Sequence, residues 1–158
     1  ITSGMLVRNI KEFKKKTNKK KIICLDCGKK KIGMAISDEN HKISIPVETI
    51  IRDKNLNNQI KEIINEFQIG GILVGLPFNE KNKINKMSQS IIDITKNIDG
   101  FLEKFEIKMP ILFWDENFTS LEAEDITKNI FKNKKKQKKS LDKFAAMVIL
   151  EDFLNFKI

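Results

Sequence analysis

The sequence has few of the residues that mark several common protein classes. Its 158 residues contain no Tyr, one Trp, one His and two Cys. A structural zinc site takes four Cys or His ligands, and Cys24, Cys27 and His41 together supply only three. No apolar run approaches the roughly 20 residues of a membrane helix. No apolar segment follows the first charges as it does in a signal peptide. We therefore expect a cytoplasmic protein without a membrane partner.

The two cysteines are spaced as C-x-x-C at Cys24 and Cys27. A redox-active pair of this spacing usually opens a helix, whereas this pair lies in an apolar run typical of a strand. Residues an odd number apart in a strand point to opposite faces of the sheet. We therefore interpret both as small apolar residues of a reduced compartment.

Positive charge dominates the composition, with 30 basic residues against 21 acidic ones and a net charge of +9. Such an excess favours an anionic partner, nucleic acid above all. Only Arg8 and Arg52 are arginines, and Ile and Asn are frequent. That bias is typical of AT-rich coding, so part of the lysine excess is compositional. The charge supports binding to nucleic acid without establishing it.

The hydrophobic pattern predicts one mixed α/β domain over residues 5–158. Residues 5–20 form a basic N-terminal extension that contains a short helix, and residues 1–4, which precede Met5, look like a cloning remnant. Short turns between the first three predicted strands imply an antiparallel meander that continues into β-α-β units. His41 lies in the turn after the second strand, where we expect it to be solvated. The expected strands are 21–27, 31–37, 42–51, 72–75 and 111–114; the expected helices follow the apolar positions of 56–67 (ended by Gly70 and Gly71), 87–105, 119–130 and 141–153, the last with Ser140 as its N-cap.

Residues 22–37 carry the first sign of a site. Two apolar strands flank a turn that contains Gly28 and three lysines, and Asp26 interrupts the first strand. A carboxylate buried alone in such a pattern is costly, so it needs a cation, a metal or an opening to water. Acid, glycine and lysine together suggest a site that handles phosphate. An Asp that only stabilises the hairpin is the alternative interpretation.

Three acids lie at the ends of predicted elements rather than on polar helix faces: Asp26, Glu116 and Asp142. Asp26 and Glu116 each end a strand, and Asp142 lies in the first turn expected for the last helix. Ligands gather at strand ends in open sheets, and clustered carboxylates persist when a cation neutralises them. Oxygen ligands select Mg²⁺ or Mn²⁺, and two such ions can stabilise in-line displacement at phosphorus. The alternative for Asp142 is an interaction with the helix dipole, and the alternative for Asp115 and Glu116 is capping of the helix that follows. Asp115 also competes with Glu116 as the ligand.

Residues 132–139 hold six lysines in eight positions. Next to Asp142, such a segment can hold a phosphate backbone. A solvated loop is the alternative interpretation of a block of like charges, and the two are compatible. No aromatic residues interleave with the lysines, so we expect recognition of shape and backbone rather than of base sequence.

At four places the sequence resembles the bacterial YqgF/RuvX family. The matching stretches are residues 25–38, 74–77, 114–116 with Thr119, and 142–150, in the family's order, and the resemblance covers residues 21–154. It implies a ribonuclease H-like fold with a mixed five-stranded sheet flanked by helices. It also implies a metal-dependent nuclease that trims the 5′ end of precursor 16S ribosomal RNA. The family's acidic site falls on Asp26, Glu116 and Asp142.

Together the residues and the resemblance predict a cytoplasmic nuclease that uses Mg²⁺ or Mn²⁺. The expected partners are structured RNA, the pre-ribosomal small subunit and branched DNA, and the chain is expected to be a monomer or a weak homodimer. One departure from the family is Asn117, where Arg is usual, so a cation for the scissile phosphate is missing or replaced by a lysine. The residues expected to hold the substrate are Lys29, Lys31, Lys134, Lys135, Lys136, Lys138 and Lys139.

Three other functions compete with this one. Cleavage of Holliday junction DNA would need a dimer to cut two strands symmetrically. An RNA- or ribosome-binding protein with a degenerate site is the non-enzymatic alternative, supported by Asn117. Asp-x-Gly also marks actin-like phosphotransferases, but those need two such domains, and 158 residues are too few.

Overall fold

Five strands form one mixed sheet in the order β3-β2-β1-β4-β5. The computed structural model describes residues 9–77, 85–115 and 134–156, and in the last range the side chains from residue 144 onward. The predicted helix 119–130 lies outside these residues. The strands are β1 (Lys21–Cys27), β2 (Lys31–Ser37), β3 (Ser44–Ile51), β4 (Ile69–Leu76) and β5 (Ile111–Asp115); the helices are α1 (Ile10–Lys16), α2 (Leu56–Phe67), α3 (Lys86–Lys104) and α5 (Lys134–Asn155).

The sheet combines the predicted meander with parallel strands. β2 pairs antiparallel with β1 and with β3, whereas β4 lies between β1 and β5 and is parallel to both. Leu25 pairs with Val74, and Val74 pairs with Phe113. The carboxyl ends of β1, β4 and β5 therefore lie at the same end of the sheet, so Asp26 and the end of β5 are on one side of the molecule, as the hypothesis of a site shared by Asp26 and Glu116 requires.

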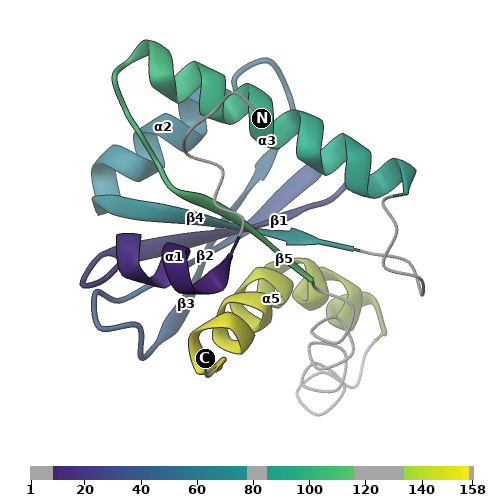
Figure 1. The fold of residues 1–158 in the computed structure, drawn as a ribbon. Coiled ribbons are helices and arrows are strands. Elements are labelled where there is room, and N and C mark those ends of the chain that lie inside the picture. Colours follow the sequence, from purple (N-terminus) through teal and green to yellow (C-terminus); the bar gives the residue numbers. More distant parts are fainter. Residues whose placement is uncertain (1–8, 78–84, 116–133, 157–158) are drawn as a thin grey trace.

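Helices cover both faces of the sheet (Figure 1). On one face, α2 and α3 pack on alternate residues such as Leu25 and Val74. On the other, α1 and α5 pack on the residues between them, such as Cys24 and Leu73. Cys24 and Cys27 are buried on opposite faces, as their spacing predicted. In the ranges described, no helix is both long and apolar enough to cross a membrane.

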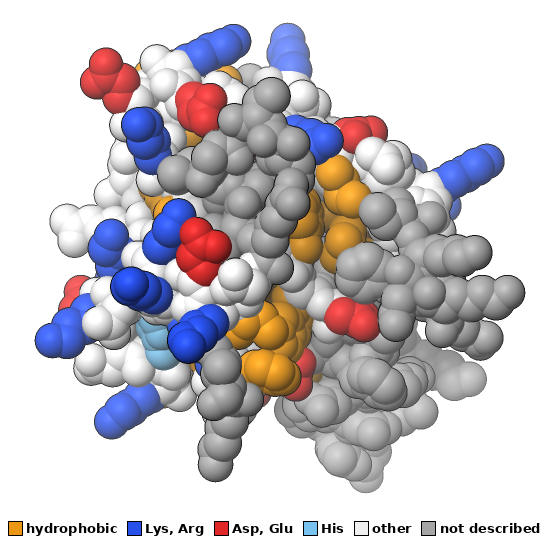
Figure 2. Space-filling model, in the orientation of Figure 1, with side chains coloured by type: hydrophobic (Ala, Val, Ile, Leu, Met, Phe, Trp, Pro, Cys, Tyr) orange, Lys and Arg blue, Asp and Glu red, His pale blue; other side chains and the backbone are white. Residues whose placement is uncertain are grey.

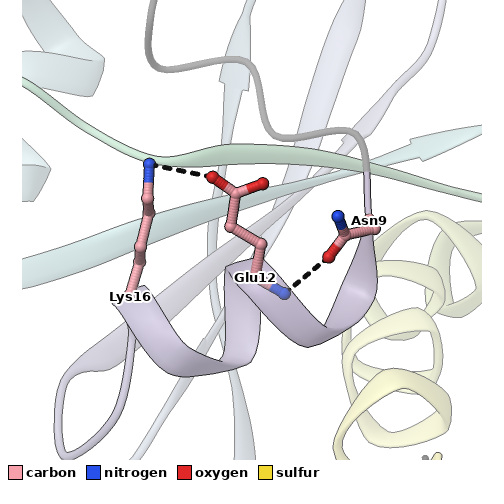
Figure 3. Close-up of polar contacts among 3 residues, drawn as sticks. All are labelled: Asn9, Glu12 and Lys16. Carbon is pink, nitrogen blue, oxygen red and sulfur yellow. Dashed lines mark hydrogen bonds and ion pairs between the residues drawn. The ribbon is translucent and has the colours of Figure 1, made fainter.

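Helix α1 begins at a polar cap and packs through one aromatic side chain. The side chain of Asn9 accepts a hydrogen bond of 2.6 Å from the backbone N–H of Glu12, and Glu12 pairs with Lys16 at 3.3 Å (Figure 3). Such a cap satisfies an N–H group that has no partner inside the helix. Phe13 is fully buried and fixes the helix against the sheet.

Two helix ends are formed by other residues than predicted. Helix α2 ends at Phe67, but its C-cap is Gln68, whose φ of 54° and ψ of 51° are left-handed, and Gly70 and Gly71 belong to β4. The last helix begins at Lys134, so Ser140 lies inside it rather than at its N-cap, and Asp142 is not in its first turn. Lysine is a good helix former, so a lysine-rich segment continues a helix more readily than a loop prediction assumes.

The turn between β2 and β3 also differs, because His41 is not simply solvated. The Asp38 carboxylate accepts hydrogen bonds from the backbone N–H groups of Ile43, Lys42 and Asn40, and these bonds, that of Ile43 first, lower the pKa of Asp38. The turn delays β3 to Ser44 instead of residue 42. His41 is half-buried and its Nε2 lies 2.7 Å from the carbonyl oxygen of Lys20.

Candidate active site

Asp26 lies near the carboxyl end of β1, on the face covered by α5. It alternates with Ile22 and Cys24, which belong to the core on that face. Its antiparallel partner on β2 is Gly33, which has no side chain to fill the neighbouring space. Asp26 is half-buried, unlike the fully buried Cys24. The glycine thus leaves the carboxylate room to meet a ligand.

A pocket of about 540 Å³ opens in front of this carboxylate. Asp26 is its only acid among the lining residues that the structure describes, and Lys29 and Lys30 of the turn and Lys31 at the start of β2 line it as well. All three lysines are exposed. The pocket therefore combines one carboxylate, suited to a divalent cation, with cations suited to phosphate. The full lining is Asp26, Gly28, Lys29, Lys30, Lys31, Gly33 and Thr49.

Thr49 enters the pocket because β3 carries a bulge. Met34 pairs with Val47 and Ile32 with Ile50, so two residues of β3 lie opposite Gly33 alone. Bulges change the direction in which a side chain points and are frequent beside active sites. The sequence did not predict Thr49, because strand alternation contains no signal for an inserted residue.

Arg52 is a second residue that the sequence analysis missed. Its Nη1 donates a 2.6 Å hydrogen bond to the carbonyl oxygen of Gly28, and its Nη2 donates one of 3.3 Å to Oγ of Ser90 on α3. Its backbone N–H also donates to the carbonyl oxygen of Lys30. One guanidinium thus ties the lysine turn to the end of β3 and to α3. Only the folded chain brings these groups together.

We expect Arg52→Met to loosen the lysine turn. Losing charge-assisted hydrogen bonds to a half-buried carbonyl should lower the free energy of unfolding by about 2 kcal/mol. It should also speed amide exchange at Gly28, whose N–H closes the turn on the carbonyl of Lys31. Urea unfolding and hydrogen exchange measure the two effects. Lys54→Met removes one exposed cation nearby and should change neither quantity; equal effects of both substitutions would show that Arg52 does not hold the turn.

Asp115 does not share the face of Asp26. It alternates with Ile111 and Phe113, which pack with α2 and α3, whereas Trp114 packs with α5. Asp115 is exposed at the end of β5. Asp115, the first of the two adjacent acids Asp115 and Glu116, therefore lies on the opposite face of the sheet from Asp26. Glu116 and Asn117 lie outside the described residues.

The remaining predicted site residues fall on α5. Asp142 and the lysines at 134, 135, 136, 138 and 139 are in this helix, and their side chains lie outside the described set. The side chains that are described bring no three Cys, His, Asp or Glu residues together as a metal site. Of the three predicted acids, only Asp26 has a side chain that the structure describes.

Comparisons with known proteins identify the family of this chain. A family model described as "RuvX: Holliday junction resolvase" matches residues 20–156. The chain belongs to the RuvX family. A relative from Pelagibacter ubique, named "Putative pre-16S rRNA nuclease", is 37% identical over 152 residues, which cover 92% of this chain and 97% of the relative. A Mycoplasma mobile relative of the same name is 42% identical over 135 residues, 83% of this chain and 89% of the relative.

The fold of this RuvX chain has a solved counterpart. Thermus thermophilus RuvC, in a structure titled as a complex with a Holliday junction substrate, aligns with a TM-score of 0.53 over 85% of this chain and 93% of RuvC. The two sequences are 11% identical, so the likeness concerns the fold alone. It confirms the ribonuclease H-like arrangement that the resemblance implied.

Proposed function

We propose that this RuvX chain is a metal-dependent nuclease that hydrolyses phosphodiester bonds at the 5′ end of precursor 16S ribosomal RNA. The observation that carries the proposal is Asp26, a strand-end carboxylate in a pocket lined by three lysines. The names of the relatives from Pelagibacter ubique and Mycoplasma mobile supply the substrate. The expected setting is structured RNA in the pre-ribosomal small subunit.

The residues suit Mg²⁺ or Mn²⁺ held by Asp26, Glu116 and Asp142. The pocket fits such an ion, because it presents a half-buried carboxylate beside a residue without a side chain, Gly33. When bound, the ions supply charge stabilisation at phosphorus and an activated water. Asp26 would hold the ion from a strand of the sheet, which positions a ligand more precisely than a loop does.

The position of Asp142 in the helix is consistent with this role. It precedes Ala146 by four residues and Ile149 by seven, and both of these are buried against the sheet. Residues at these helical intervals share one face. The spacing therefore supports Asp142 as a proposed ligand on the helix that covers the face of the sheet carrying Asp26.

The lysines have two roles in the proposal. Lys29 and Lys31 lie at the pocket and would hold the phosphates next to the cut. The five lysines of the first turns of α5 would hold the backbone further along. One of these cations would take the place of the Arg that the family usually has where this chain has Asn117.

Holliday junction cleavage remains the second candidate, because the matching family model carries that description. The two substrates are separated by incubating the protein with a 5′-extended 16S precursor and with a four-way DNA junction, each with Mg²⁺, Mn²⁺ or a chelator. Metal-dependent cutting of the RNA alone supports the proposal. Cutting of the junction alone would contradict RNA as the substrate. Binding of RNA without cutting in either Mg²⁺ or Mn²⁺ would contradict the proposed nuclease activity.

We expect replacement of Lys134, Lys136 and Lys138 by Gln to weaken RNA binding. Each phosphate contact of a single strand contributes roughly 0.7 to the slope of log affinity against log salt, so the slope should become shallower by about 2. Fluorescence anisotropy over a salt series, with a chelator present, measures this slope.

The matched control replaces three exposed lysines of α3 by Gln instead: Lys86, Lys96 and Lys104. If both triple variants change the slope equally, the effect is one of net charge, and α5 does not hold the backbone.

A further inference from the structure

A second basic pocket lies at the other end of the sheet from Asp26. It has a volume of about 780 Å³ and opens where β1 and β4 begin and where the chain enters β5. Basic side chains, drawn in blue, are numerous on this side of the molecule, at the left of Figure 2, over the connection from α1 to β1 in Figure 1. The charged residues of its lining are Lys16, Lys19, Lys20, Lys21, Lys108 and Glu39.

Most of these lysines are available to a ligand. Lys16 pairs with Glu12. In the described ranges, Lys19, Lys21 and Lys108 have no carboxylate within 4.0 Å. Glu39 is the one acid among the described lining residues. Positive charge concentrated in a concave site focuses the field and attracts anions. Neighbouring lysines that lack ion pairs therefore favour a ligand that carries several negative charges.

The connection that presents the lysines is packed tightly on β4. A Cβ atom on Gly71 would lie 2.4 Å from Cγ2 of Thr17, and one on Gly70 would lie 2.5 Å from Cβ of Lys20. Thr17 is fully buried and its hydroxyl donates to the carbonyl oxygen of Phe13 at 2.8 Å. The two glycines at the start of β4 thus let the connection lie directly against the strand.

His41 holds the same connection from the other side. The carbonyl oxygen of Lys20 can only accept, so Nε2 of His41 donates the 2.7 Å hydrogen bond between them. Asp38 fixes the turn in which His41 lies through its bonds to backbone N–H groups. The lysines of the second pocket therefore extend from a backbone held on two sides, and such preorganisation lowers the cost of binding.

We propose that the second pocket binds the phosphate backbone of the RNA substrate at a distance from the cut. This inference rests on the proposed function for its ligand. Lys21 and Asp26 lie near opposite ends of β1, five residues apart, or about 17 Å at the rise of a strand. An RNA that reaches both pockets is held at two places. The chain would thus select a long or folded RNA over a short one.

The test neutralises Lys19, Lys21 and Lys108 together by Lys→Gln substitution. Lys20 is kept, because its side chain packs on Gly70. With a chelator present, affinity for the 5′-extended precursor should fall about tenfold at low salt, and the salt slope should become shallower by about 2. The control is again the triple Lys→Gln variant at 86, 96 and 104, which should change affinity less than twofold. Equal behaviour of the two variants would overturn the proposal.

A second measurement uses the unaltered protein, so that it does not depend on how the variants fold. Lysines are acetylated briefly with and without RNA, and the modified sites are found by mass spectrometry. RNA should protect Lys19, Lys21 and Lys108 at least threefold and leave Lys96 and Lys104 unprotected. Modification of Lys19, Lys21 and Lys108 at the same rate in both samples would contradict the proposal and would leave an acidic protein as the ligand to consider.

The two proposals fail in different ways. If the wild type does not cut RNA but the Lys19, Lys21 and Lys108 variant binds it more weakly than the control, only the catalytic proposal fails. If the wild type cuts the precursor with metal and this variant binds like the control, only the second pocket fails.

Discussion

Asp26→Asn should reduce metal-dependent cleavage about 1000-fold, which corresponds to about 4 kcal/mol of transition-state stabilisation. Asparagine keeps the shape of the side chain but removes the charge that attracts a divalent cation. The change is measured as the initial cleavage rate at saturating RNA. RNA affinity should stay the same or rise, because the substitution removes the one acid among the described residues that line a lysine-rich pocket.

Asp115→Asn is the matched control for this loss. Asp115 ends the strand next but one to β1, yet it alternates with the residues of the opposite face of the sheet. Its substitution should change the cleavage rate less than about twofold. Full activity of Asp26→Asn, or an equal loss in both variants, would show that the site does not lie on the α5 face of the sheet.

Phe153→Ala should lower the free energy of unfolding by about 3 to 5 kcal/mol, because it empties the centre of a buried aromatic cluster. Phe153 is fully buried, and its ring meets Phe13 of α1 at 5.6 Å and Trp114 of β5 at 5.3 Å between centroids. Trp114 also donates a 2.9 Å hydrogen bond to Asp152, which joins β5 directly to α5. Loss of the ring therefore weakens the contact of α5 with both elements.

The control for Phe153 is Phe105→Ala, the same substitution at a side chain that is 49% exposed. It should cost less than about 1 kcal/mol, since it leaves no buried cavity, although it removes contacts with Phe101 and Lys61. Urea unfolding measures both variants. Similar losses would mean that α5 does not depend on the aromatic cluster for its place on the sheet.

Much of the fold could be predicted because neighbouring residues determine it. The bounds of β1, β2 and α2 agree with the apolar patterns of residues 21–27, 31–37 and 56–67. Gly70 and Gly71 were wrongly assigned as helix terminators, because their actual role is to admit Lys20 and Thr17, which are distant in sequence. Ser140 was wrongly taken as a cap, because a capping residue signals a helix start only where the preceding residues do not continue the helix.

The part of the candidate site that lies in the β1–β2 hairpin could be predicted from the sequence. Asp26, Lys29 and Lys31 are joined by a short turn, so the sequence itself implies their proximity. Arg52 and Thr49 reach the site through a later strand and a bulge, and neither leaves a local signal. The second basic pocket collects residues as far apart as Lys16 and Lys108, which only the folded sheet brings together.

The most direct test of the proposed function maps the 5′ end of 16S precursor RNA after incubation with the wild-type protein and Mg²⁺ or Mn²⁺, beside Asp26→Asn and a chelated sample. The account predicts a new, defined 5′ end in the metal samples of the wild type and none in the other two. The same cut made by Asp26→Asn, or no cut by a wild-type protein that still binds the RNA, would contradict it.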